Sequence, residues 1–243
     1  MKIGLCQFDI KLQDREENKK RILKLLEENH LKEAEWLIFP ELTLDGSTIK
    51  KEVDEFKKED FLFFENIAKT NNIHVTFGCI NKKRNKLFTL NAQGNIISDY
   101  SKINLFRMTH EDRFYIPGTS QDIFEIDDFR ILPSVCFDLK FPNIYWDKAE
   151  KTDIIVNIAN WPKKRNDHWT TLIKARAIEN QTYMIGVNRT GMDGCIVYGG
   201  NSVIYDPMGM KIINSGEEAG IFISEINLDE VKKTRIKNPI IRK

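Results

Sequence analysis

The sequence predicts an α/β fold built on mixed β-sheets. Short apolar segments of strand length alternate with longer amphipathic segments of helical length, a succession typical of sheets covered by helices. The turn signal Gln93-Gly94-Asn95 joins two neighbouring strand-like segments as a hairpin, so part of the sheet is expected to be antiparallel. No Pro-, Gly- or Ser-rich linker and no repeat divides the chain, so we expect one domain over residues 1–243.

The first half of the chain carries two helical patterns among five strand-like segments. The second helix is the clearer one, because Phe61, Phe64 and Ile67 recur at helical spacing. In chain order, the expected strands lie at 2–8, 36–40, 74–80, 87–92 and 95–100, and the expected helices at about 14–31 and 58–72.

The second half repeats this alternation. Its last helix has an apolar stripe that includes Trp169 and Ile173, which predicts a core helix with buried or partner-facing ion pairs near its end. The expected strands lie at 129–137, 153–161 and 183–189, and the expected helices at about 145–151 and 167–181.

Composition excludes several classes of protein. With 243 residues, 41% hydrophobic and 30% charged, the chain can bury a full core, which argues against disorder and coiled coil. A net charge of +1 gives no electrostatic footprint for nucleic acid, and we interpret the basic clusters at 82–86 and 162–167 as solvated turns. No apolar run approaches the ~20 residues of a membrane span, and no secretory segment opens the chain. We therefore expect a cytoplasmic protein.

The four cysteines form no CxxC pair and no zinc-like pattern with the four histidines, so neither a disulfide framework nor a metal site is expected. Cys6 and Cys79 lie within strand-like runs and are interpreted as core thiols. Cys195 lies in a loop without an evident partner. Cys136, at the end of the segment LPSVC, is either a buried core thiol or a nucleophile.

Four apolar strand-like segments each end in a polar or aromatic side chain. These are Glu41, Lys102, Cys136 and Trp161. Ligands of open α/β sheets bind beyond the carboxyl ends of strands, so the four residues are candidates for one site.

Each candidate has a functional and a structural interpretation. Desolvation of Glu41 would raise its pKa toward that of a general base, whereas a capping role would leave it at the surface. Lys102 could hold an oxyanion or lie on a solvated face. Cys136 could pair with His168 or His110, although neither histidine has a local signature of a catalytic pair. Trp161 could belong to the core or wall a ligand pocket.

The ordered set of motifs carries a resemblance that no single motif would. FPEL around Glu41, YSKINLF around Lys102 and CFDLKFP around Cys136 resemble the nitrilase superfamily of carbon–nitrogen hydrolases in order and spacing, over Met1 to about Asn227. SKINLFRMTHED, ANWPKKRNDHW and TLIKARAIENQ resemble its ω-amidase branch, whose members hydrolyse the terminal amide of 2-oxoglutaramate or 2-oxosuccinamate to the 2-oxo dicarboxylate and ammonia. The resemblance implies a four-layer α-β-β-α sandwich, a homodimer, and no metal or organic cofactor.

The resemblance also implies catalytic roles. Cys136 would attack the amide carbon while Glu41 takes the thiol proton, and Lys102 would hold the oxyanion together with the Phe137 backbone N–H. The family's second glutamate corresponds to Glu111.

Substrate recognition is expected at the same site. Phe137 and Trp161 could restrict the pocket to small, unbranched substrates. The candidates for binding a substrate carboxylate are Arg107, His110, Arg113 and Lys140. The last of these departs from the family, which commonly has Arg at that position, and a lysine lacks the bidentate fork.

Other functions stay open at this point. The chain could be an N-carbamoyl or other aliphatic amide hydrolase of the same superfamily, a ligand-binding homologue without turnover, or a structural dimer whose polar loop is an interaction surface. Rapid labelling of one thiol by iodoacetamide would favour an enzyme, and uniformly slow labelling would favour the last two. The lysine-rich tail at 232–243 could cross to a partner or form a solvated end.

Overall fold

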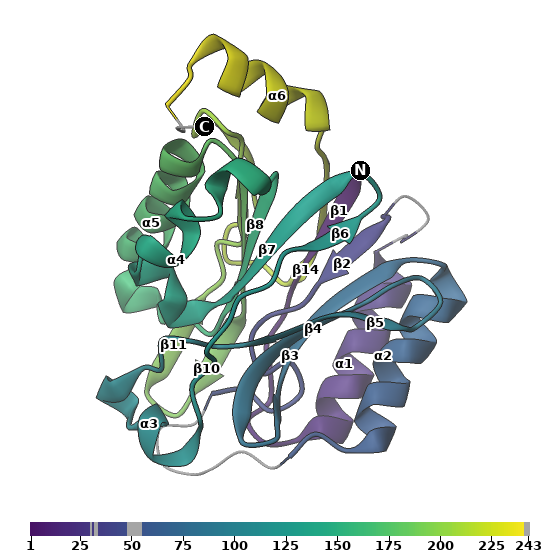
Figure 1. Ribbon diagram of the computed structural model, residues 1–243. Helices are drawn as coiled ribbons and strands as arrows, with labels where there is room; N and C mark the ends of the chain where they lie inside the picture. Colours follow the sequence, from purple (N-terminus) through teal and green to yellow (C-terminus); the bar gives the residue numbers. More distant parts are fainter. Residues whose placement is uncertain (30, 32–33, 48–54, 241–243) are drawn as a thin grey trace.

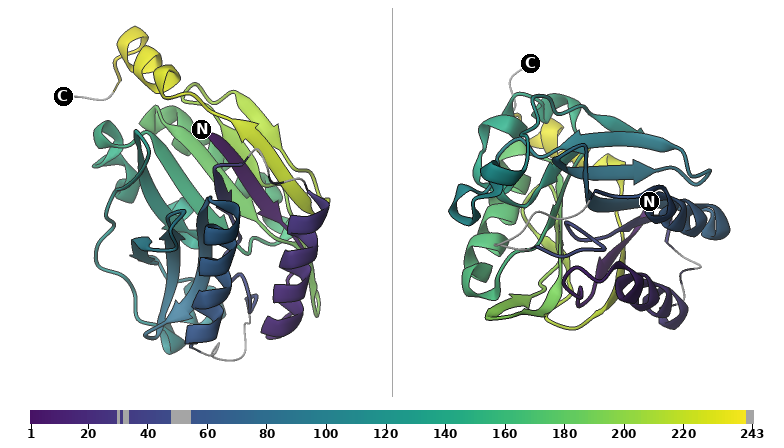
Figure 2. Two further views of the ribbon diagram at one scale, coloured as in Figure 1. Left: turned by 90° about the vertical axis from the view of Figure 1, so that its right-hand side faces the viewer. Right: turned by 90° about the horizontal axis from the view of Figure 1, so that it is seen from below.

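Two six-stranded sheets pack face to face, with helices covering their outer faces (Figures 1 and 2). The computed structural model describes residues 1–29, 31, 34–47 and 55–240. The arrangement is a four-layer α-β-β-α sandwich, so the predicted α/β fold with mixed sheets is confirmed.

The first sheet has the strand order β14-β1-β2-β3-β4-β5. Its central strands β1, β2 and β3 are parallel, and the outer neighbours are antiparallel. The strands are β1 Lys2–Gln7, β2 Trp36–Ile38, β3 His74–Asn81, β4 Arg84–Leu90, β5 Ile96–Ser101 and β14 Gly220–Glu225. The helices α1 (Arg15–Glu28) and α2 (Lys58–Asn71) cover its outer face (Figure 1).

The second sheet repeats this plan in the order β13-β12-β9-β8-β7-β6, with β7, β8 and β9 parallel. The strands are β6 Phe124–Ile126, β7 Phe129–Val135, β8 Ile154–Ala159, β9 Tyr183–Asn188, β12 Val203–Tyr205 and β13 Lys211–Asn214. The helices α4 (Asn143–Trp146) and α5 (Asn166–Asn180) cover its outer face. Parallel strands within each sheet place their carboxyl ends at a common edge.

Smaller elements complete the chain. The two-stranded ribbon of β10 (Thr190–Asp193) and β11 (Ile196–Gly199) stands apart from both sheets, and α6 (Leu228–Lys237) lies beyond their far end (Figure 1). The remaining helical turns are η2 Arg107–Thr109, α3 Glu111–Phe114, η3 Cys136–Lys140, η4 Ala149–Lys151 and η5 Lys163–Arg165. No helix within the described ranges is long and apolar enough to cross a membrane.

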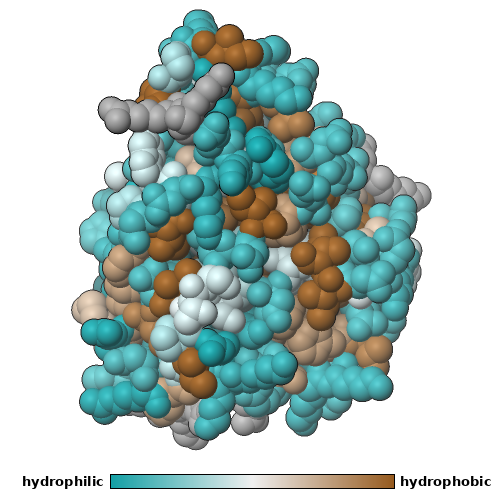
Figure 3. Space-filling model, viewed as in Figure 1, coloured by the Kyte–Doolittle hydropathy of each residue, from teal (hydrophilic) through white to brown (hydrophobic). Residues whose placement is uncertain are grey.

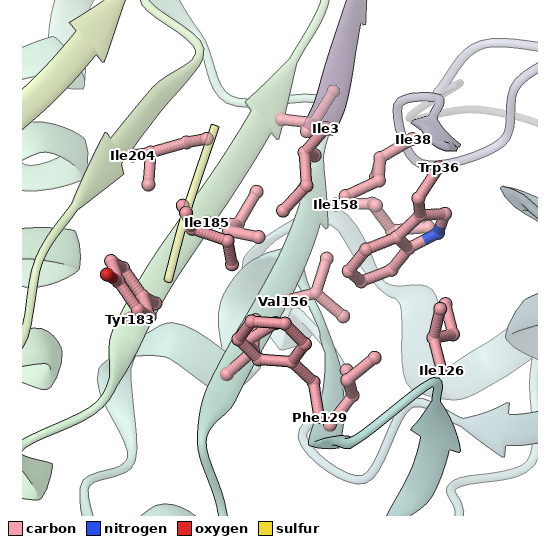
Figure 4. Close-up of a cluster of buried hydrophobic side chains, with 14 of the residues drawn as sticks. Ile3, Trp36, Ile38, Ile126, Phe129, Val156, Ile158, Tyr183, Ile185 and Ile204 are labelled. Carbon is pink, nitrogen blue, oxygen red and sulfur yellow. The ribbon is translucent and has the colours of Figure 1, made fainter. Parts of the chain in front are cut away.

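Alternation along the strands builds three apolar layers. In β8, Ile154, Val156 and Ile158 point between the two sheets, whereas Ile155 and Ala159 face the outer helices. Both faces of β8 are therefore buried, which explains why its sequence is a continuous apolar run. Figure 4 shows the layer between the sheets, where Val156 and Ile158 of the second sheet meet Trp36 and Ile3 of the first. The face seen in Figure 3 carries its hydrophobic residues in small groups separated by hydrophilic ones.

Several expectations need correction. The helix predicted at 145–151 is two separate turns, α4 and η4, because α4 begins earlier, directly after Pro142, and the chain must turn again before it enters β8. The strands β6 and β10 to β14 were not predicted, and all of these except β14 have only three or four residues. Half of the lysine-rich tail belongs to α6, which lies against its own chain through buried Val231 and Thr234. Residues 241–243 of that tail lie outside the described residues.

Candidate active site

A pocket of about 160 Å³ opens where β2, β5, β7 and β8 end. Its lining contains all four side chains that follow those strands, namely Glu41, Lys102, Cys136 and Trp161. The structure therefore brings together residues that lie far apart in the sequence, as the strand-end pattern predicted.

Glu41 is held by a turn that packs directly on β3. The Thr43 N–H donates to the Gly78 carbonyl at 2.8 Å, and the Gly78 N–H donates to the Thr43 hydroxyl at 3.0 Å. A Cβ on Gly78 would lie 2.6 Å from the Leu42 nitrogen and 2.9 Å from the Glu41 Cα, closer than real Cβ atoms come. Only glycine lets the turn approach this closely, so Gly78 fixes the position of Glu41.

Lys102 lies between two carboxylates. Its ammonium is 3.1 Å from Glu41 Oε1 and 3.0 Å from both carboxylate oxygens of Glu111. The Phe106 N–H donates to Glu111 Oε2 at 2.6 Å, which ties the loop after Lys102 to the same carboxylate. The side chains of Glu41 and Lys102 are only 5% and 3% exposed, so this cluster is shielded from solvent.

Two asparagines that sequence reasoning missed complete this cluster. The Asn85 amide donates to Glu41 Oε1 at 2.8 Å and to Glu111 Oε1 at 2.9 Å, so it bridges the two carboxylates. The Asn160 N–H donates to Glu41 Oε2 at 2.9 Å, and its amide donates to the Glu41 carbonyl at 2.9 Å. Asn160 follows β8 directly, so the rule that found Trp161 could also have found Asn160.

The basic cluster at 82–86 is not simply a solvated turn. Lys82 and Lys83 form the β3–β4 turn with positive φ, but Asn85 and Lys86 are buried in β4. The solvated-turn interpretation is therefore wrong for these last two residues. The surrounding charges concealed Asn85, because a short run of Lys and Arg looks like an exposed hairpin.

The ion pairs hold Lys102 and Glu111 in their charged forms. Burial alone would lower the pKa of Lys102, but Glu111 and Glu41 outweigh it and raise that pKa well above its ordinary value. Burial would raise the pKa of Glu111, but the Lys102 ammonium and the Phe106 N–H outweigh it and lower that pKa below 4.5. Both groups are therefore charged near neutral pH.

Cys136 sits on a sharp turn between β7 and η3. Its φ is +46°, a left-handed conformation that non-glycine residues rarely adopt and that surrounding contacts must hold in place. Asp138, fully buried, supplies these contacts by accepting the Val135 N–H at 3.0 Å and the Tyr100 hydroxyl at 2.7 Å. It also accepts the Asn104 N–H at 2.8 Å. Asp138 thus couples the turn of Cys136 to the segment that carries Lys102.

The outer helix α5 braces the other end of this turn. The buried Arg176 guanidinium donates to the Leu139 carbonyl through Nε at 3.1 Å and Nη2 at 2.9 Å. Its Nη1 pairs with Glu179 at 2.8 Å, which confirms the predicted core helix with ion pairs near its end.

The environment of Cys136 favours the neutral thiol. Burial raises the pKa of this thiol well above its ordinary value, the Glu41 carboxylate raises it further, and Lys102 only partly opposes the two. The resting nucleophile therefore carries its proton, and a base must remove that proton during attack. Neither His110 nor His168 lines the pocket among the described residues, and both are exposed.

The predicted substrate-binding residues separate into two groups. Phe137, Trp161 and Lys140 line the pocket. The side chains of Arg107, His110 and Arg113 are exposed, and none of them is among the described residues that line the pocket. The expectation that these three reach the site is therefore not met in this structure. The segments η2 and α3 turn Glu111 inward and these neighbours outward.

Arg165 and Tyr198 also line the pocket, although neither was proposed from the sequence. Arg165 comes from the basic cluster at 162–167, where it was interpreted as part of a solvated turn, and Tyr198 comes from β11. No signal in the sequence places either at the pocket, because both get there through contacts between distant segments. Over the described ranges, no three His, Cys, Asp or Glu side chains are arranged to hold a metal ion.

Comparison with known proteins identifies the class. The carbon-nitrogen hydrolase family model matches residues 2–236, so the chain belongs to this family, the nitrilase superfamily, and is a hydrolase that acts on amides.

Individual relatives cover almost the whole chain. The 2-oxoglutaramate amidase of Bacillus subtilis is 31% identical over 250 residues, covering 98% of this chain and 95% of that protein. A protein described as the hydrolase in the agr operon of Staphylococcus aureus is 30% identical and covers 100% of this chain and 97% of its own. A CN-hydrolase superfamily protein of Xanthomonas campestris, solved with an arsenic adduct in its active site, aligns with a TM-score of 0.91 at 26% identity, covering 99% and 96%.

Proposed function

We propose that this amidase hydrolyses the terminal amide of small 2-oxo dicarboxylate monoamides, 2-oxoglutaramate and 2-oxosuccinamate, through a thioester on Cys136. The observation that carries the proposal is the shared position of the Cys136 thiol, the Glu41 carboxylate and the Lys102 ammonium at one pocket. The substrate class is supported by relatives of about 30% identity that are named 2-oxoglutaramate amidase and omega-amidase.

In the first half of the reaction, the Cys136 sulfur attacks the amide carbon as Glu41 takes the thiol proton. Attack and proton transfer are coupled because the resting thiol is neutral. Lys102 and the Phe137 N–H hold the oxyanion of the tetrahedral intermediate. Glu41 then gives its proton to the amide nitrogen, the C–N bond breaks, and ammonia leaves an acyl thioester on Cys136.

In the second half, Glu41 removes a proton from water and the resulting hydroxide adds to the thioester carbon. Collapse of this intermediate breaks the C–S bond, releases the carboxylic acid and returns the proton to Cys136. Glu111 acts by positioning Lys102, to which both of its oxygens are bonded.

Two unsatisfied oxygens fit an amide substrate. The Oδ1 atoms of Asn85 and Asn160 are buried and accept no hydrogen bond from any described residue, and both asparagines line the pocket. An amide nitrogen, or the ammonia that leaves, supplies the donors that these acceptors lack.

The test is ammonia release from 2-oxoglutaramate by the wild type and by Cys136→Ala. Glutamine, asparagine and an N-carbamoyl amino acid serve as comparison substrates. We expect fast release confined to 2-oxo acid amides, reduced roughly 10⁴-fold or more in the variant because the nucleophile is lost. Release confined to an N-carbamoyl amino acid would transfer the proposal to that class of hydrolase.

The homodimer, the cytoplasmic location and the single domain stay predictions. Light scattering of the purified protein would test the homodimer.

The thiol-labelling experiment needs a Cys195→Ser background, because Cys195 is exposed at the β10–β11 turn and would react alongside Cys136.

A further inference from the structure

The loop from Trp161 to Arg165 is fixed on both sides of the pocket. The Trp161 N–H donates to Asn188 Oδ1 at 2.8 Å, and Pro162 forms an isolated bridge with Tyr198 of β11. The Trp161 indole donates to the Arg165 carbonyl at 2.8 Å. The backbone of Arg165 is therefore set by the residue that forms one wall of the pocket.

The Arg165 guanidinium lies close to two aromatic rings. Its carbon is 5.1 Å from the centroid of Phe106 and 5.9 Å from that of Trp161. Phe106 follows Lys102 and packs on Phe137, the residue after Cys136, with ring centroids 4.8 Å apart. Two contacts of this kind restrict where the guanidinium can go and keep it at the pocket wall.

No described residue offers Arg165 a counter-ion or accepts a hydrogen bond from its guanidinium. By contrast, the guanidinium groups of Arg176 and Arg189 pair with Glu179 and Asp193. Lys140, whose ammonium lies 6.0 Å from the Trp161 ring centroid, likewise forms no ion pair within the described ranges. The wall of the pocket thus presents two cations that have no ion-pair partner among the described residues.

The carboxylates of the pocket cannot serve these cations. Glu41 and Glu111 are both bonded to Lys102 and Asn85. A guanidinium carries five donors in a rigid fork that matches a carboxylate. An anion that enters with the ligand would give Arg165 the partner that it lacks among the described residues.

We propose that Arg165 selects the substrate by binding the carboxylate at the end remote from the scissile amide, with Lys140 as a second cation. This rests on the proposed amidase function and transfers the role first expected of Arg107, His110 and Arg113 to a residue at the pocket wall. The aromatic walls hold the apolar middle of the substrate, and the amide end lies at Cys136. Substrates that lack the remote carboxylate leave Arg165 unpaired and bind weakly.

The first test is Arg165→Gln, which removes the charge but keeps a polar side chain. We expect KM for 2-oxoglutaramate to rise roughly 10- to 100-fold, the worth of a charge-assisted hydrogen bond. The turnover rate at saturating 2-oxoglutaramate is expected to change less than about 3-fold, and so is the KM for pentanamide, which has no carboxylate. Arg165→Lys keeps the charge without the fork and is expected to fall between the wild type and Arg165→Gln. An equal loss on both substrates, or no change on either, would overturn the inference.

Lys164→Gln is the matched control. Lys164 precedes Arg165, is exposed, and is not among the described residues that line the pocket. Its replacement by Gln changes the net charge by the same amount as Arg165→Gln. We expect its KM for 2-oxoglutaramate to match the wild type. A rise equal to that of Arg165→Gln would mean that long-range charge, rather than a carboxylate subsite, explains the effect.

A binding measurement separates this inference from the proposed reaction. In a Cys195→Ser background, iodoacetamide alkylation of Cys136 is followed with and without glutarate, which carries carboxylates and no amide. We expect glutarate to slow alkylation, and to lose this effect in Arg165→Gln even if 2-oxoglutaramate proves not to be a substrate. Equal protection of both proteins, or protection of neither, would refute the carboxylate subsite whatever the reaction.

Discussion

The two sheets contribute different kinds of group to one pocket. The first sheet supplies Glu41, Asn85 and Lys102, followed by Glu111, and every charge in this set is paired with another member. The second sheet supplies Cys136, Trp161 and Arg165, and Arg165 has no counter-ion among the described residues. Among the described residues, the charged groups proposed to perform the chemistry are thus paired with one another, whereas Arg165, which we propose binds the substrate carboxylate, has no counter-ion. If both proposals hold, preorganisation and recognition come from different sheets.

Lys102→Ala should separate these two roles most strongly. The ammonium stabilises charge that exists only in the tetrahedral intermediate, so we expect kcat to fall roughly 10²- to 10³-fold with KM little changed. Steady-state kinetics on 2-oxoglutaramate would show the reverse pattern to Arg165→Gln. Retention of full turnover would remove Lys102 from the oxyanion site, and circular dichroism would confirm that the variant is folded.

Asn85→Ala should have a smaller effect of the same kind. Loss of the amide removes the bridge between Glu41 and Glu111, and we expect kcat to fall roughly 10- to 100-fold through misplacement of the base. Asn85→Asp is the sharper comparison, because it puts a third carboxylate against the other two and should be worse than alanine. If the alanine and aspartate variants were both as active as wild type, the bridge would have no role in positioning.

Glu111→Gln tests the same cluster through its contribution to stability. The pKa of Glu111 is lowered by folding, so its ionised form stabilises the protein above the ordinary pKa of 4.5, and this contribution is lost as the pH falls further. We expect the variant to lose about 1–3 kcal/mol of unfolding free energy at pH 7, with the difference shrinking below pH 4.5. Urea unfolding at several pH values would measure it. A difference that is constant down to pH 3 would contradict the ion pair.

The sequence predicted the residues proposed for catalysis better than the residue proposed to bind the substrate carboxylate. Glu41, Lys102 and Cys136 each follow an apolar strand, so a local pattern pointed to a common edge of the sheets. Arg165 follows no such pattern, because its position depends on rings contributed by Phe106 and Trp161 from separate segments. Loops carry little periodic signal, so the same limit applies to Arg107, whose side chain is exposed.

The elements of the fold also differ in how well the sequence predicted them. Long elements such as α2 and α5 were predicted within a residue or two, because a repeated apolar period fixes them. The strands β10 to β13 have only three or four residues each, and β14 is placed by its pairing with β1 at the other end of the chain. Asn85 illustrates both limits, since only the pairing of β4 with β3 and β5 shows that it is buried.

The pairing of β1 with β14 has a consequence for how the molecule forms. Lys2 lies opposite Glu225 and Gln7 opposite Gly220, so one edge of β1 stays open until a segment more than two hundred residues later has been synthesised. An unpaired edge of this kind can pair with other chains. Until β14 has been synthesised, this edge of the first sheet lacks its partner strand, and truncation before β14 would leave it open.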